Sequence, residues 1–156
     1  MTNLTLDIRG TNQLENEDID DISDLYMLCF HSDHSEKDNP DLKSELKFVI
    51  SGYMMIWFLL REGGKLVSMA SYRYTNDKDL LGDLATAPDE QGKGYMREVM
   101  KEVIYFHKQN FGSSKPLTLT VNKDKEHTQR LIKTYQRFGF ELCGQDKRDF
   151  YMKLDF

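Results

Sequence analysis

The chain has 156 residues, 39% of them hydrophobic and 12% aromatic, which is typical of one folded domain spanning 1–156 and not of a disordered chain. Its formal net charge of −5 argues against a nucleic-acid surface spread over the whole protein and is compatible with a cationic substrate. Two cysteines are too few for a disulfide framework. The first ten residues lack the features of a signal peptide, and the longest apolar run, Tyr53–Leu60, is too short to span a bilayer. We therefore expect a cytoplasmic protein with no membrane partner.

The first half of the chain predicts a strand, two helices and a hairpin. Apolar and polar residues alternate at Leu4–Ile8, as in a strand. Helical spacing of apolar residues predicts two amphipathic helices, one through Ile22, Leu25, Tyr26 and Cys29, and one through Leu42, Leu46, Val49 and Ile50. The apolar run Met54–Leu60 predicts a strand buried on both faces. A glycine turn after it predicts a return strand that ends at Thr75.

The second half alternates strands with helices. Leu80–Ala87 is apolar enough for a strand, and Pro88 ends it because proline has no N–H for the ladder. The elements that follow are a helix ending near Asn110, a strand at 117–121, a helix at 127–138 and closing strands at 140–143 and 150–154. Hairpins in the first half and crossovers in the second predict a mixed α/β sheet with helices on both faces.

A short glycine-bearing turn lies between the predicted strand Leu80–Ala87 and the next helix. Gly92 and Gly94 precede Met96, Val99, Met100 and Val103, which fall at the spacing of an amphipathic helix. The first turn of a helix has unpaired N–H groups and a positive dipole end, which suit a phosphate or pyrophosphate. The Walker A loop does not fit, because Tyr95 follows Gly94, and the Rossmann loop does not fit, because Arg97 stands at its third glycine.

Two motifs resemble those of the GNAT acetyltransferase superfamily. Gln91-x-x-Gly94-x-Met96 is similar to that family's pyrophosphate loop, with Met96 where a small residue is usual. The residues before it, Asp83 to Pro88, look like the family's fourth strand. Near the C-terminus, Thr128-x-x-Leu131-x-x-x-Tyr135 followed by Phe138-Gly139-Phe140 resembles the closing signature, with Thr128 in place of asparagine and Leu131 in place of alanine. The resemblance covers most of the chain, from Leu4 onward.

The resemblance implies the fold and the cofactor. It implies a mixed, largely antiparallel central sheet flanked by about four helices, with a splay between the fourth and fifth strands. The cosubstrate would be acetyl-CoA, with no metal. Its pyrophosphate would take backbone N–H groups of the loop, with charge added by side chains at the helix start, and its pantetheine arm would pair with the fourth strand. The residues implied in cofactor binding are Leu84, Ala85, Thr86, Gln91, Gly92, Lys93, Gly94, Tyr95, Met96, Arg97 and Thr128.

Acetyl transfer needs a neutral amine and a proton for the leaving thiolate. By resemblance, Tyr135 is the acid that protonates the thiolate; the plainer interpretation is a core tyrosine. Asp83 is the carboxylate nearest the catalytic strand, and it could act as a base through water or bind the substrate ammonium. Asp79 is the alternative base, and water alone is a third option. Cys29, His31 and His34 do not have the spacing of a zinc site.

The sequence thus predicts an enzyme that acetylates a primary amine, which could be a small amine, a polyamine, an aminoglycoside-like compound or a protein amine. An acidic stretch at Asp33, Glu36 and Asp38 favours a cationic acceptor. A homodimer is compatible with the sequence, and no nucleic-acid partner is expected. Two other classes stay open: a non-catalytic acyl-CoA-binding or sensor module on the same fold, and an unrelated nucleotide-binding protein.

Overall fold

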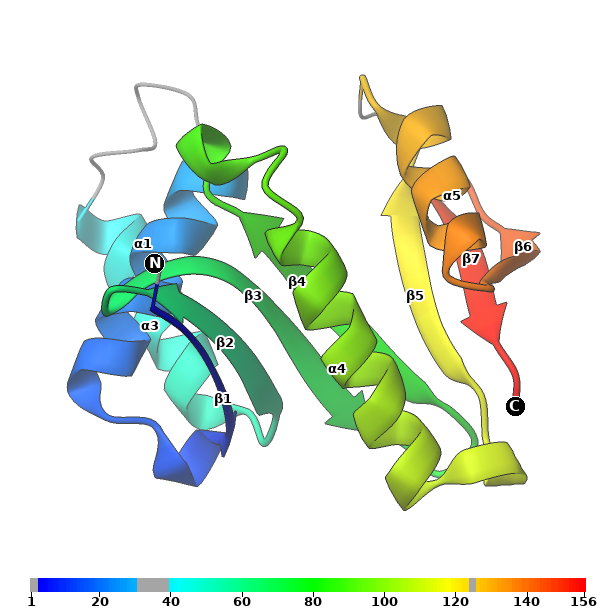
Figure 1. Cartoon of the computed structure of the whole chain (residues 1–156), viewed down its shortest axis with the longest axis horizontal. Coiled ribbons are helices and arrows are strands. Elements are labelled where there is room, and N and C mark those ends of the chain that lie inside the picture. Colours follow the sequence, from blue (N-terminus) through cyan, green and yellow to red (C-terminus); the bar gives the residue numbers. More distant parts are fainter. Residues whose placement is uncertain (1–2, 31–39, 124–125) are drawn as a thin grey trace.

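The structure is a computed structural model that describes residues 3–30, 40–123 and 126–156. These residues form a seven-stranded sheet of order β1-β2-β3-β4-β5-β7-β6 (Figure 1). Neighbouring strands are antiparallel except for β4 and β5, which are parallel. The strands are β1 Leu4–Gly10, β2 Ile56–Glu62, β3 Lys65–Tyr74, β4 Asp79–Thr86, β5 Leu117–Asn122, β6 Glu141–Gln145 and β7 Asp149–Leu154. The mixed, largely antiparallel sheet predicted from the sequence is confirmed.

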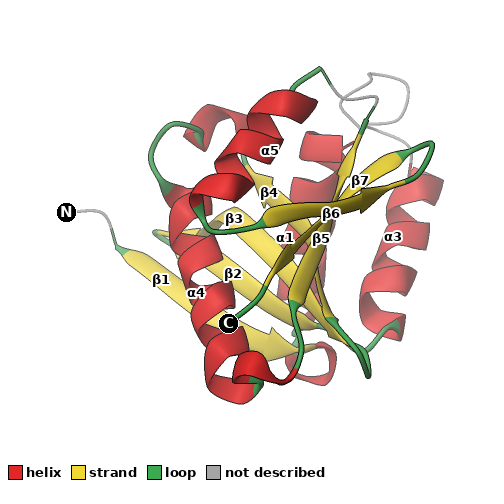
Figure 2. Ribbon diagram, turned by 90° about the vertical axis from the view of Figure 1, so that its right-hand side faces the viewer, coloured by secondary structure: helices red, strands yellow, loops and turns green. Residues whose placement is uncertain are grey.

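Helices cover both faces of the sheet. The described residues contain the helices α1 Asn16–Phe30, α3 Pro40–Gly52, α4 Tyr95–Asn110 and α5 Thr128–Arg137, with 3-10 turns at Thr11–Gln13, Pro88–Glu90 and Gly112–Ser114. Helices α1 and α3 lie on one face, and α4 and α5 lie on the other (Figures 1 and 2). Within the described part of the chain, none of the helices is long and apolar enough to cross a membrane.

The two faces of the sheet have separate hydrophobic clusters. Alternate residues of β2 divide between them: Phe58 packs in the cluster with α4 and α5, and Trp57 and Leu59 pack in the cluster with α1 and α3. Burying such a side chain contributes about 1.5–3 kcal/mol, so both faces stabilise the central strands. The prediction of a doubly buried strand is confirmed, but β2 begins at Ile56. Met54 is 73% exposed and lies before the strand, because pairing with β1 starts at Ile56.

Strands β4 and β5 part after a short parallel contact. Their register covers two residue pairs, Asp79 with Leu117 and Leu80 with Thr118. Strand β5 then follows β7 through six pairs, up to Asn122. We call residues 91–94, between β4 and α4, the glycine loop. Figure 1 shows the two strands diverging from their contact toward this loop. We call this divergence the splay, and it confirms the splay expected between the fourth and fifth strands.

Candidate functional site

The glycine loop has the backbone that an anion-binding helix start requires. Gly92 and Gly94 both have φ of +83°, and Gly94 is the N-cap of α4. A side chain at φ in this range is strained, so glycine suits both positions. Nothing lies within 4 Å of the place that a Cβ would take at either glycine, so the space before them is open. The N-terminal N–H groups of α4 can therefore be approached closely.

Side chains of the loop hold it in place or carry charge. Tyr95 is buried, and its hydroxyl donates a hydrogen bond to Glu62 at the end of β2, which raises the pKa of Tyr95. Lys93 is exposed, and its Nζ lies 2.6 Å from Glu90 Oε2, a hydrogen bond that raises the pKa of Lys93. Arg97 is exposed in the first turn of α4. Met96 is half-buried and packs against the core.

The predicted cofactor residues of β4 meet the glycine loop around one hollow. Leu84, Ala85, Thr86 and Gln91 line a hollow of about 290 Å³ together with Leu28, Cys29 and Pro88. The Gln91 side chain amide donates to the Thr86 carbonyl at 3.5 Å. We call this space the β4 hollow. Leu84–Thr86 and Gln91, which the resemblance assigns to acetyl-CoA binding, therefore lie around the same space.

Thr128 lies apart from the β4 hollow. Its hydroxyl donates to the Asn122 carbonyl at 2.7 Å and so ties the start of α5 to the end of β5. It lines a second hollow, of about 610 Å³, with the basic residues Lys123, His127 and Arg130. The structure thus places Thr128 beyond the far end of β5, away from Leu84–Thr86.

Asp83 occupies a bulge in β4. Ser71 of β3 pairs with Gly82, but Met69 pairs with Ala85, so two residues of β4 face one residue of β3. Asp83 has φ of +47°, a left-handed conformation that is unusual for a residue other than glycine. The bulge turns its carboxylate toward Ser71, whose hydroxyl donates to Asp83 Oδ2 at 2.7 Å.

Aromatic side chains of α1 lie on the same face as the Asp83 carboxylate. Burial raises the pKa of Tyr26, and the negative charge of Asp83 raises it further. The ring of Tyr26 lies 4.7 Å from the ring of Phe30, between centroids. A carboxylate whose charge reaches an aromatic side chain is an environment that suits a cationic amine.

Tyr135 lies on the opposite face of the sheet. It belongs to α5, which packs on β5, and its ring contacts Phe140 in the α4–α5 cluster. Burial raises the pKa of Tyr135 to about 12, so the hydroxyl keeps its proton at pH 7. The two predicted catalytic residues thus come from opposite faces, one on β4 and one on the helix that covers β5.

Asp79 is placed where it cannot meet an acceptor from solvent. Its side chain is fully buried at the start of β4, where Lys115 Nζ lies 2.7 Å from Oδ1 and the Tyr72 hydroxyl donates to Oδ2. A carboxylate so enclosed is a poor base for a diffusing substrate, which favours Asp83 over Asp79.

Sequence reasoning overlooked Ser71, Tyr26 and Cys29 as neighbours of the site. Cys29 belongs to the apolar stripe of α1, and its thiol lies 3.4 Å from the Thr86 carbonyl. Burial raises the pKa of Cys29 to about 11, so it is a thiol at neutral pH. The acidic stretch at 33–38 and the histidines at 31 and 34 lie outside the described residues. Among the residues that are described, no three His, Cys, Asp or Glu side chains group as metal ligands.

Comparisons with known proteins identify the family of the chain and its fold. A sequence model described as the acetyltransferase (GNAT) family matches residues 19–140. UPF0039 protein C11D3.02c of Schizosaccharomyces pombe is 29% identical over 152 residues, which are 92% of this chain and 89% of the yeast protein.

Solved structures share the fold at low sequence identity. An acyl-CoA N-acyltransferase from Pseudomonas aeruginosa has a TM-score of 0.74 at 12% identity, with 97% of this chain and 99% of that chain covered. A PaiA N-acetyltransferase from Thermoplasma acidophilum in complex with coenzyme A has a TM-score of 0.72 at 13% identity, with the same coverage. The N-acetyltransferase PseH from Campylobacter jejuni in complex with acetyl coenzyme A has a TM-score of 0.64 at 18% identity, again covering 97% and 99%. The family model spans most of the chain, and the chain therefore belongs to the acetyltransferase (GNAT) family.

Proposed function

We propose that this protein is an N-acetyltransferase that moves the acetyl group of acetyl-CoA to a primary amine. One observation carries the proposal: Asp83 and Tyr135 lie on opposite faces of the sheet, on β4 and on the helix over β5, where those two strands part. An acceptor and a thioester can then meet across the sheet with a base on one side and an acid on the other. PaiA with coenzyme A and PseH with acetyl coenzyme A, which share the fold, support the choice of cosubstrate.

The chain offers a suitable cradle for the cosubstrate. The left-handed glycines leave the first N–H groups of α4 open to the pyrophosphate, and the helix dipole favours its charge. Arg97 can add a guanidinium to a phosphate. Leu84–Thr86 border the β4 hollow, and their backbone is the proposed partner of the pantetheine amides.

Acetyl-CoA would supply an activated acetyl thioester. The ammonium group of the acceptor first loses one proton and becomes a neutral amine. A bond then forms between the amine nitrogen and the acetyl carbon as the carbon–sulfur bond breaks, so a second proton leaves the nitrogen for solvent and one proton reaches the sulfur. Asp83 takes the first of these protons, directly or through water, and Tyr135 donates its hydroxyl proton to the sulfur. The pKa of Tyr135, about 12, keeps the hydroxyl protonated at neutral pH until the transfer.

The groups around Asp83 support one class of acceptor. The Asp83 carboxylate and the rings of Tyr26 and Phe30 suit an ammonium group before it loses its proton. A cationic primary amine is therefore the proposed acceptor.

The test has two stages. Thermal shift is first measured with CoA, acetyl-CoA and ATP, because a ligand that binds only the folded state raises the melting temperature. Release of the CoA thiol is then followed over a panel of primary amines. Stabilisation by CoA together with turnover of at least one amine supports the proposal. Binding of CoA with no turnover of any amine indicates a non-catalytic acyl-CoA-binding module, and stronger stabilisation by ATP indicates another nucleotide-binding protein.

A further inference from the structure

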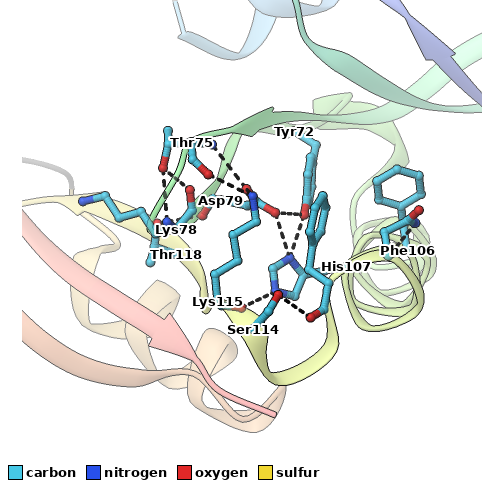
Figure 3. Close-up of polar contacts among 11 residues, drawn as sticks. Tyr72, Thr75, Lys78, Asp79, Phe106, His107, Ser114, Lys115 and Thr118 are labelled. Atoms are coloured by element: carbon cyan, nitrogen blue, oxygen red, sulfur yellow. Dashed lines mark hydrogen bonds and ion pairs between the residues drawn. The ribbon is translucent and has the colours of Figure 1, made fainter.

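A buried polar cluster lies at the end of β4 away from the glycine loop, and the proposed chemistry does not use it. Tyr72 of β3, Asp79 of β4 and His107 of α4 are each 0% exposed, and Lys115, just before β5, completes the cluster (Figure 3). Removing charges from water costs several kcal/mol for each ion unless they are well paired. Residues of β3, β4, α4 and the segment before β5 thus meet in a cluster that is stable only if its charges are well paired.

The Asp79 carboxylate is the centre of the cluster. Lys115 Nζ lies 2.7 Å from Oδ1, and the Tyr72 hydroxyl donates to Oδ2. His107 Nδ1 lies 2.6 Å from the Tyr72 hydroxyl oxygen, and His107 Nε2 lies 2.8 Å from the Lys115 carbonyl. Because a carbonyl only accepts, Nε2 carries a proton. The contacts therefore close a ring that links β3, β4, α4 and the start of β5, as Figure 3 shows.

The backbone of Asp79 is tied to β5 as well. Its N–H donates to the Pro116 carbonyl at 3.0 Å, and its carbonyl accepts from the Thr118 hydroxyl at 2.9 Å. Asp79 and Leu117 are the first pair of the parallel register, which ends one residue later. Backbone and side chain of one residue thus hold β4 and β5 together at the point from which they diverge.

A small change in the direction of β4 at Asp79 displaces the other end of the strand by a larger distance. Six residue steps separate Leu80 from Thr86, which at about 3.3 Å each is about 20 Å. A reorientation of β4 by about 5° at Asp79 would then displace Thr86 by about 1.7 Å, the scale of misplacement that matters for ligand geometry. We propose that Asp79 is a positioning residue that sets the splay of β4 and β5 and thereby the affinity for acetyl-CoA. This inference rests on the proposed function for its ligand.

The experiment compares Asp79→Asn with a matched control, Asp18→Asn. Asparagine keeps the shape but turns an NH₂ donor toward Lys115 or Tyr72, which also donate. Asp18 is likewise buried and lies 2.9 Å from Arg61, but it belongs to α1 and has no part in the splay. Both variants should lower the melting temperature. CoA affinity measured by calorimetry should fall about tenfold, or about 1.4 kcal/mol, in Asp79→Asn alone. The KM for acetyl-CoA should rise in parallel, with kcat at saturation changed by less than about threefold.

Two further measurements keep the inference falsifiable. If Asp79→Asn does not fold, Lys115→Met should weaken CoA binding and Lys115→Arg should restore it, since only arginine keeps the charge. Amide hydrogen exchange is also measured on the ligand-free proteins. Strands β4 and β5 should exchange faster in Asp79→Asn or Lys115→Met than the same strands do in Asp18→Asn. A folded Asp79→Asn protein with wild-type CoA affinity overturns the inference. A wild-type protein that does not bind CoA overturns the proposed function. In that case the positioning role is judged by hydrogen exchange alone, and equal exchange of β4 and β5 in Asp79→Asn and Asp18→Asn overturns it too.

Discussion

The hydroxyl of Ser71 donates a 2.7 Å hydrogen bond to Oδ2 of Asp83, at the bulge where β4 changes direction. Asp83 takes a left-handed backbone conformation there, which costs about 1 kcal/mol for a residue other than glycine. The neighbouring strand, through Ser71, holds the carboxylate in one orientation. The strained backbone and the fixed orientation of its carboxylate are consistent with the proposed role of Asp83 as the base.

Asp83→Asn tests the role of this carboxylate. Asparagine tolerates the left-handed conformation and can still accept from Ser71, so the bulge should persist. If Asp83 takes the amine proton, kcat should fall by about 10²-fold, mainly on the low-pH side of the profile, with acetyl-CoA affinity unchanged. The measurement is kcat against pH for the variant and the wild type. A wild-type profile in the variant would assign proton removal to water, since Asp79 is enclosed by Lys115 and Tyr72.

Gly94→Asp tests the cofactor loop. Gly94 has φ of +83° at the N-cap of α4, so aspartate would add backbone strain and a negative charge where phosphates are expected. We expect CoA to produce no thermal shift. Gly112→Asp is a matched control, because Gly112 also has positive φ but lies past the other end of α4. Should folded Gly94→Asp bind CoA as the wild type does, the loop would not be the pyrophosphate site.

The two cysteines should differ in reactivity with iodoacetamide. Cys143 is exposed, whereas burial raises the pKa of Cys29 to about 11. Because the thiolate is the reactive form, Cys29 should react slowly below about pH 9 and faster as the pH approaches 11. Mass spectrometry of Cys143→Ser and Cys29→Ser proteins measures each thiol separately. Bound CoA should slow the alkylation of Cys29 further, since Cys29 lines the β4 hollow. Fast labelling of Cys29 at pH 8 would contradict the placement of its thiol.

The sequence predicted the elements better than the contacts between them. The strand ending before Pro88 and the helix ending at Asn110 are observed at Asp79–Thr86 and Tyr95–Asn110, since proline and helical periodicity act locally. The bulge at Asp83 was not predicted, because it depends on how β3 pairs with β4. The buried cluster around Asp79 was not predicted either, because His107 and Lys115 are distant from it in sequence and carry no motif. Family resemblance indicated Leu84–Thr86 and Gln91, but only the fold shows that they share a hollow with Cys29.

Tyr135→Phe is the variant on which the enzymatic interpretation depends most. It removes one hydroxyl and keeps the ring, so packing against Phe140 should survive and the fold should remain. Because the pKa of Tyr135 is raised to about 12, the hydroxyl is protonated throughout the neutral range and can donate to a developing thiolate. We expect kcat to fall by about 10²-fold or more, the usual scale for a general acid. CoA affinity should change little, since backbone groups of the loop and of β4 are proposed to bind the cosubstrate. Tyr105→Phe, which removes an exposed hydroxyl on α4, is the control and should keep wild-type turnover. Wild-type kcat in Tyr135→Phe would make Tyr135 a core residue only, and the thiolate would then take its proton from solvent.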